Sequence, residues 1–289
     1  MPENTTLKKI QKDLQQALKQ IDCYKVKYNL SPKPTLRIIH HFACSGGTLI
    51  SKCLAAQPNV FLLSELHPTT QLGINMNKAA YTPRDITTQA IYGRVPSVDD
   101  LAEKLFVNGI IETEKHIRER GGYLVIRAHT HSDYCTDAPI PEVDTISRLL
   151  EPHFELKHLV TVRNPIESFM SLRDNGWIHF EPASFDEYCR RLLKFIKPFD
   201  SNQIMKYESF VESSDTTIKC FAEKLDIPLD IRGLSYFDIF KVSGDSGRSG
   251  TTIEARPSKQ ISGSLNAEAQ SSVSYKNLIR ELGYESICG

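Results

Sequence analysis

Short apolar runs alternate with longer amphipathic stretches along most of this 289-residue chain. The apolar runs have the length of strands and lie at residues 36–42, 59–63, 123–128, 156–162 and 203–207. The amphipathic stretches predict helices over residues 48–57, 97–119, 165–175, 184–197, 213–226 and 265–282. Strands separated by helices usually pair in parallel, because a crossover of this length returns the chain to the same edge of the sheet. The pattern therefore predicts an α/β fold with a central, mainly parallel sheet.

The first 30 residues predict a separate element. Leu7, Ile10, Leu14, Ala17, Ile21, Tyr24 and Tyr28 follow one another at alternating steps of three and four, which is a heptad seam on a helix. The prolines of S-P-K-P at 31–34 end this helix. We expect an N-terminal amphipathic helix within residues 1–30 and one α/β domain over 31–289. The seam fits packing on the chain's own domain, or a short coiled coil that would form a homodimer.

Composition restricts the classes of partner. Lys plus Arg equals Asp plus Glu, 35 each, so no overall positive field attracts nucleic acid or an anionic membrane. The seven cysteines include no C-x-x-C pair, which disfavours a zinc site or a disulfide framework and suits a cytoplasmic location. No apolar run approaches the roughly 18 residues of a membrane helix, so we expect no membrane span.

The segment C-S-G-G-T, from Cys44 to Thr48, lies where the first predicted strand passes into the first predicted helix. Gly46 and Gly47 let the backbone turn its amides inward, and a helix N-terminus carries partial positive charge. Such a loop can bind phosphate without a cationic side chain. It lacks the lysine of a Walker A loop, which disfavours a nucleotide kinase. Glycine turns of this kind are common, so the segment alone is weak support for a phosphate site.

Further polar residues lie at the ends of other predicted strands. Arg127 and His129 come at the end of 123–128, and Arg163 follows the strand at 156–162, with Ser171 two turns into the next helix. Tyr207, in M-K-Y-E-S-F, follows the last strand. Open α/β sheets bind ligands at the carboxyl ends of their strands. We therefore expect these residues and the glycine loop to face one crevice.

In this order, between residues 36 and 256, the motifs resemble the sulfotransferases that use 3′-phosphoadenosine 5′-phosphosulfate (PAPS). The resemblance implies a P-loop-type, three-layer α/β domain that transfers a sulfuryl group to a hydroxyl or amine of an acceptor. It implies PAPS as the cofactor, adenosine 3′,5′-bisphosphate (PAP) as the product, and no metal.

The resemblance also assigns the cofactor contacts. The family's K/R-S-G-T-T loop holds the 5′-phosphosulfate and matches Ser45, Gly46, Gly47 and Thr48. An arginine at a strand end and a serine eight residues later hold the 3′-phosphate, which is the spacing of Arg163 and Ser171. Y-E-S-F resembles the family's Y-E-D-L segment, which implies that Tyr207 lies near the adenine. S-G-D-S-G-R-S-G at 243–250 resembles a loop that closes over the 3′-phosphate, which implies contacts from Gly247 and Arg248.

Two positions depart from the family pattern. Cys44 stands where the family has a lysine or arginine that neutralises the leaving group, so we expect Arg127 or Lys52 to supply that charge. Leu49 stands where cytosolic members place an aromatic side chain against the adenine. We expect Cys44 and Leu49 to line the cofactor site nonetheless. Cys44 is either a small loop residue or a thiol whose pKa the helix N-terminus lowers.

Two residues compete for the role of catalytic base. R-A-H at 127–129 resembles the family's K-T-H segment, which implies His129 as the base and Arg127 in place of the lysine. A neutral imidazole suits the role, since its unperturbed pKa is about 6.5. Glu65, in S-E-L-H-P, resembles the glutamate of family branches that modify protein tyrosines, and it could be the base, orient the acceptor or cap the next turn. We expect His129 to be the base.

The acceptor half of the site is the least determined. It should lie in residues 67–96 and 177–186, where Tyr81, Tyr92, Trp177 and His179 favour a carbohydrate, so a small-molecule or glycan acceptor is the expected partner. One alternative is a nucleotide-dependent phosphotransferase that uses ATP and magnesium. Another is a non-catalytic adenine-nucleotide-binding module, which Cys44 makes credible.

Overall fold

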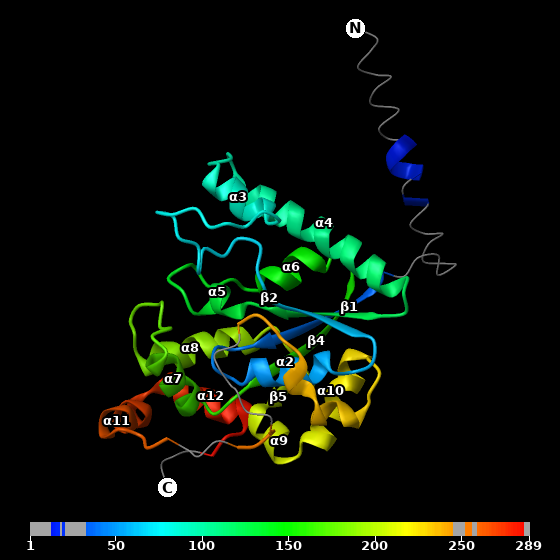
Figure 1. The fold of residues 1–289 in the computed structure, drawn as a ribbon. Coiled ribbons are helices and arrows are strands. Elements are labelled where there is room, and N and C mark those ends of the chain that lie inside the picture. The colour runs from blue at the N-terminus through cyan, green and yellow to red at the C-terminus, as the bar shows by residue number, and fades with distance from the viewer. Residues whose placement is uncertain (1–12, 18, 21–32, 245–251, 256–258, 286–289) are drawn as a thin grey trace.

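The computed structural model describes residues 13–17, 19–20, 33–244, 252–255 and 259–285. Its described residues form a five-stranded sheet in the order β2-β3-β1-β4-β5 (Figure 1). The strands are β1 (Thr35–His41), β2 (Val60–Leu66), β3 (Tyr123–Ala128), β4 (Glu155–Val162) and β5 (Ile204–Lys206). Every neighbouring pair is parallel. The α/β fold with a parallel sheet is thereby confirmed, and each predicted strand is present within three residues of its expected ends.

Helices cover both faces of this sheet (Figure 1). They are α2 (Gly47–Ala55), α3 (Ile86–Tyr92), α4 (Val98–Arg118), α5 (Thr130–Tyr134), α6 (Thr145–Leu150), α7 (Pro165–Asp174), α8 (Phe185–Ile196), α9 (Tyr207–Glu212), α10 (Ser214–Leu225), α11 (Gly263–Ser271) and α12 (Val273–Leu282). The sequence pattern predicted the longer ones and missed the short helices α3, α5, α6 and α9. A single helix over 265–282 was wrong, because Ser272 leaves the helical conformation, caps α12 and donates to Asp186.

The central strand shows why both faces are covered. Successive side chains of a strand point to opposite faces, so Ile38 and Ile39 enter different cores, and both are fully buried. Ile39 packs with α2 and α10, while Ile38 packs with α4 and α6. A third core lies between β4, α7, α8 and α12. Because β1 is the central strand and is covered on both faces, the glycine loop starts from the buried core of the sheet.

The N-terminal segment is described only in part. Residues 13–17 and 19–20 are helical and exposed, and most of the heptad seam lies outside the described residues. The amphipathic helix over 1–30, the boundary at residue 31 and the homodimer stay predictions. Across the part of the chain that the structure describes, no helix combines the length and apolar character needed to cross a bilayer.

Candidate active site

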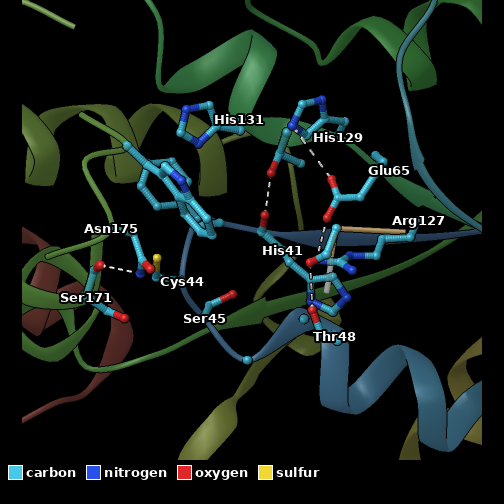
Figure 2. Close-up of a pocket in the computed structure, with 18 of the residues that line it drawn as sticks. His41, Cys44, Ser45, Thr48, Glu65, Arg127, His129, His131, Ser171 and Asn175 are labelled. Atoms are coloured by element: carbon cyan, nitrogen blue, oxygen red, sulfur yellow. Dashed lines mark hydrogen bonds and ion pairs between the residues drawn. The ribbon is translucent and has the colours of Figure 1, made fainter. Parts of the chain in front are cut away.

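A cavity of about 590 Å³ opens at the carboxyl ends of β1, β2, β3 and β4 (Figure 2). It brings together most of the residues that the sequence singled out. Its lining includes Cys44, Ser45, Gly46, Gly47, Thr48, Leu49, Glu65, Arg127, His129, Arg163, Ser171 and Tyr207. Gly247 and Arg248 lie outside the described residues. The expected convergence on one crevice is therefore met by every described member of the predicted set.

The glycine loop is shaped by two rings that press against it. Gly46 has φ +84° and precedes α2, and a Cβ added to it would lie 2.2 Å from the Tyr207 ring. A Cβ on Gly47 would lie 2.6 Å from the His41 ring. Both positions thus require glycine, Gly46 for its conformation as well as its size. The amides of Leu49 and Ile50 donate to the Gly46 carbonyl, so those of Gly47 and Thr48 are the amides of the first turn that have no acceptor within α2 and can bind an anion.

The loop hydroxyls are held by backbone carbonyls. The Ser45 hydroxyl donates to the Thr161 carbonyl at 3.3 Å, inside the protein. The Thr48 hydroxyl donates to the Gly244 carbonyl at 3.1 Å, which joins the loop to the segment that precedes 245–251. Ser243 and Ser64 exchange hydrogen bonds beside it. Ser243 and Gly244 therefore lie against the glycine loop and β2, while the rest of 243–250 lies outside the described residues.

Cys44 is a neutral thiol in this site. Its backbone has φ +63°, and burial raises the pKa of its thiol to about 11, although Ser171 hydrogen-bonds the sulfur and Arg163 lies near. Loss of solvent outweighs the effect of these neighbours, so the alternative of a thiol with a lowered pKa is wrong. Cys44 is the small loop residue that was the other expectation.

Glu65 and Arg127 form the charged centre of the cavity. Nη2 of Arg127 lies 2.5 Å from Oε1 of Glu65, and Nη1 donates to Ser64 and to the Ser243 carbonyl (Figure 2). Glu65 has φ +58° at an irregularity in the pairing of β2 with β3. Burial raises the pKa of its carboxyl, and the Arg127 charge opposes that shift. The unusual backbone is what turns this carboxylate toward Arg127.

His129 lies beside the same carboxylate. Its Nε2 is 3.8 Å from Oε2 of Glu65, and its Nδ1 is 3.1 Å from the Ser132 hydroxyl. Burial lowers the pKa of its imidazole to about 4, and the nearby His67 and Arg127 act in the same direction. His129 is therefore neutral near pH 7, which is the form that accepts a proton. His67 pairs with Asp133 at 3.2 Å and lies outside the cavity lining.

Arg163 is held at the end of β4 by its surroundings. Nη2 of Arg163 lies 2.5 Å from Oε2 of Glu167, and its guanidinium carbon lies 5.4 Å from the centre of the Tyr207 ring. Asn164 caps α7 with its side chain, and Pro165 follows at the start of the helix. The backbone amide of Asn164 donates to the Glu208 carboxylate at 2.8 Å, which ties this corner to α9. Arg163 and Ser171 both act on the thiol of Cys44, so they line the same part of the cavity.

The structure separates some expected residues from the cavity and adds others. Lys52 does not line it, so of the two cations offered in place of the loop lysine, Arg127 is the one that does. Tyr81 is 93% exposed and Tyr92 is also outside the lining. Thr70, Leu72 and Gly73 lie within residues 67–96, the region expected for the acceptor, whereas sequence reasoning missed Thr130, His131 and Asn175. Only His131 carried a signal, since it shares the A-H-T-H stretch with His129.

The paired histidines in the first strand are both buried, because helices cover both faces of the sheet. His41 lines the cavity floor and is hydrogen-bonded to Thr161 and Ser51, while His40 faces His158 on the other side.

Among the described residues, no group of three or more His, Cys, Asp or Glu side chains is placed to hold a metal ion.

Comparison with known proteins finds likeness only at the level of the fold. No family model matches the sequence, and no curated protein matches it. The sulfotransferase domain of the curacin biosynthetic pathway is a structural neighbour with TM-score 0.51 and 17% identity, covering 88% of this chain and 99% of its own. The sulfotransferase domain of the Synechococcus PCC 7002 olefin synthase gives TM-score 0.48 and 17% identity, over 89% and 97%.

Proposed function

We propose that this chain, which has the fold of a sulfotransferase domain, transfers a sulfuryl group from PAPS to a hydroxyl or amine of an acceptor. One observation carries the proposal: the glycine loop, the Arg163–Ser171 pair and the His129–Glu65–Arg127 cluster all line one cavity. Sulfuryl transfer needs a loop that binds one anion, a contact for a second anion and a proton acceptor, and these three groups supply them in that order. A fold likeness alone would not assign them.

The residues present fit a doubly phosphorylated nucleotide. The glycines leave room for an anion over the first turn of α2, whose amides would hold the 5′-phosphosulfate with Ser45 and Thr48. Arg163 and Ser171 would hold the 3′-phosphate, and Gly247 and Arg248 remain proposed contacts from the sequence. Tyr207, packed on Gly46, would border the adenine, with Leu49 as an apolar contact. Cys44 would contribute a small neutral wall.

The chemistry divides between the donor and the chain's own groups. When bound, PAPS supplies a sulfuryl group whose sulfur bonds to the acceptor oxygen or nitrogen as its bond to the phosphate oxygen breaks. His129 would take the acceptor proton onto a ring nitrogen, since it is neutral near pH 7. Arg127 would stabilise charge that grows on the phosphate oxygen, in place of the loop lysine. Glu65, next to both, would orient them.

The experiment is thermal unfolding of the purified chain with PAP, with ATP and magnesium, and with neither. Saturation at 100 times the dissociation constant stabilises a fold by about 2.7 kcal/mol. We expect PAP to raise the melting temperature and Arg163→Ala to remove that effect. Greater stabilisation by ATP with magnesium would favour the phosphotransferase, and the absence of any shift would refute the proposed nucleotide site.

A second measurement separates the enzyme from a binding module. A non-catalytic module would bind PAP without transferring sulfate from PAPS to any acceptor. The proposed enzyme releases PAP from PAPS in the presence of an acceptor, and release should require His129. PAP binding without such release would leave the chain as an adenine-nucleotide-binding module.

A further inference from the structure

Beyond the glycine loop and the arginines, the cavity has a second wall built from two distant segments. Residues 130–136 follow β3, and residues 177–181 follow α7. Thr136 and His179 form an isolated parallel bridge, and the amide of Glu181 donates to Asp137 at 2.9 Å. The wall is therefore a defined surface of the fold.

A buried arginine fixes this wall from behind. Arg191, on α8, donates to the carbonyls of Tyr134 and Thr136 and lies 4.6 Å from the centre of the Phe180 ring. Its charge is balanced by Glu187 at 2.6 Å. Because Arg191 contacts both 130–136 and 177–181, it holds the side chains on the cavity side of these segments in fixed relative positions.

Three histidine rings lie in a row, from His129, the proposed base, through His131 to His179. The rings of His129 and His131 are stacked, with centroids 6.1 Å apart, and Nε2 of His131 lies 3.0 Å from Nδ1 of His179 (Figure 2 labels the first two). In such a bond the accepting nitrogen carries no proton. Burial lowers the pKa of His131 to about 3, which keeps that imidazole uncharged at neutral pH.

The charges in the cavity are distributed unevenly. Of its described lining residues, the Asp, Glu, Lys and Arg side chains are Glu65, Arg127 and Arg163. None of them belongs to the wall formed by 130–136 and 177–181. Trp177, which is two residues before His179 and 37% exposed, adds a flat apolar surface to the lining of the same cavity. An anion placed on this wall would lose water without gaining a cation, which is unfavourable.

Building on the proposed function, we propose that the His131–His179 pair and Trp177 form the acceptor subsite and select an uncharged hydroxyl compound carried on a ring. The histidine pair offers ring nitrogens to a second hydroxyl of the acceptor, and the indole covers the face of its ring. His179 is a specificity-determining residue in this arrangement, and His131 positions it. Acceptors with a carboxylate or sulfate on the ring are excluded by the missing cation.

The test measures acceptor binding to the full chain in the presence of saturating PAP, by calorimetry. Two matched pairs of probes place a neutral hydroxyl group or a carboxylate at the same ring position: 2,6-dihydroxynaphthalene with 6-hydroxy-2-naphthoate, and methyl β-glucopyranoside with methyl β-glucuronide. We expect the neutral member of at least one pair to bind at least about tenfold more tightly than its carboxylate. The pair that binds separates an aryl acceptor from a sugar. Equal or tighter binding of the carboxylates, or no binding of any probe, would overturn the inference.

Variants identify the residues responsible. His179→Ala should weaken binding of the neutral probe by about tenfold, since a hydrogen-bonding partner is lost. His179→Gln, which can still bond His131, should restore most of the affinity, and His153→Ala, on the exposed surface, should have no effect. Unchanged affinity in His179→Ala would remove His179 from the subsite. PAP binding, measured first in each sample, separates the two proposals: its absence refutes the donor site, whereas its presence with the wrong acceptor preference refutes only the subsite.

Discussion

The guanidinium of Arg127 and the carboxylate of Glu65 meet at 2.5 Å across the ends of neighbouring strands β3 and β2. This ion pair lines the same cavity as a glycine loop that has no cation of its own, and Arg127 is one of the two arginines among the described lining residues. The same carboxylate lies 3.8 Å from His129. One glutamate thus links the proposed cation to the proposed base, and the predictions below separate their roles.

Replacing His129 should abolish nearly all turnover, whereas replacing Glu65 should not. A general base contributes about 10²- to 10⁴-fold to a rate, so we expect a loss of that order in kcat for His129→Ala. Glu65→Gln keeps the shape of the side chain and should cause only a mild loss. The measurement is PAP release from PAPS with a saturating acceptor. A severe loss in Glu65→Gln beside a mild loss in His129→Ala would exchange the two assignments.

The acid limb of the pH profile should lie near pH 4. The imidazole of His129 has a pKa lowered from 6.5 to about 4 by burial, so it stays unprotonated, and competent as a base, well below pH 6. We expect kcat/KM for the acceptor to remain level from pH 7 to pH 5 and to fall near pH 4. A profile that already falls at pH 6.5 would contradict the burial of this ring.

The same groups make stability depend on pH in a defined direction. In the unfolded chain His129 and His131 bind protons near pH 6.5, but in the folded chain their pKa values are about 4 and about 3. Below pH 6.5 the unfolded state therefore binds more protons, and the free energy of unfolding should fall as the pH drops toward 4, by on the order of a few kcal/mol. Urea unfolding at pH 7.0, 5.5 and 4.5 measures this, and His129→Gln should flatten the decrease.

Gly46→Ala should destabilise the protein and weaken PAP binding more than the same substitution at another glycine with a positive φ. A Cβ at Gly46 would strike the Tyr207 ring, whereas Gly121 has a similar φ of +74°, has open space around it and does not line the cavity. Gly121→Ala therefore measures the conformational strain alone, of about 1 kcal/mol. Equal losses of unfolding free energy and equal PAP affinity in the two variants would show that Tyr207 does not shape the loop.

Cys44 should react slowly with iodoacetamide at pH 7.5. The thiolate is the reacting form, and a pKa of about 11 leaves far less thiolate than the value near 8.5 of a free cysteine. We expect labelling in the folded protein to be about a hundredfold slower than labelling of the same residue in urea. Mass spectrometry of the peptide that contains Cys44 provides the rate, and fast labelling in the folded state would indicate a thiolate stabilised by the helix N-terminus.

The spacing of apolar residues and the positions of helix-capping and helix-breaking residues determined most of the fold. Apolar runs of strand length and amphipathic stretches located β1 to β5 and the longer helices, because side-chain periodicity is a local property of the chain. The helix expected over 165–175 begins at Pro165 as α7, for the same local reason. The fixed order of short motifs was enough to expect one crevice at the carboxyl ends of the strands, since parallel pairing brings those ends to one edge.

Only the tertiary structure decided which side chains act on one another. The break between α11 and α12 depends on Asp186, which is 86 residues from Ser272, and the thiol pKa of Cys44 depends on burial by elements distant in sequence. Of the two cations expected from the sequence, Arg127 and Lys52, only Arg127 lines the cavity, because strand pairing, which residue spacing does not encode, places it there. The His131–His179 contact joins residues 48 positions apart. Periodicity is read along the chain, whereas distances, burial and charge balance arise only when the chain has packed.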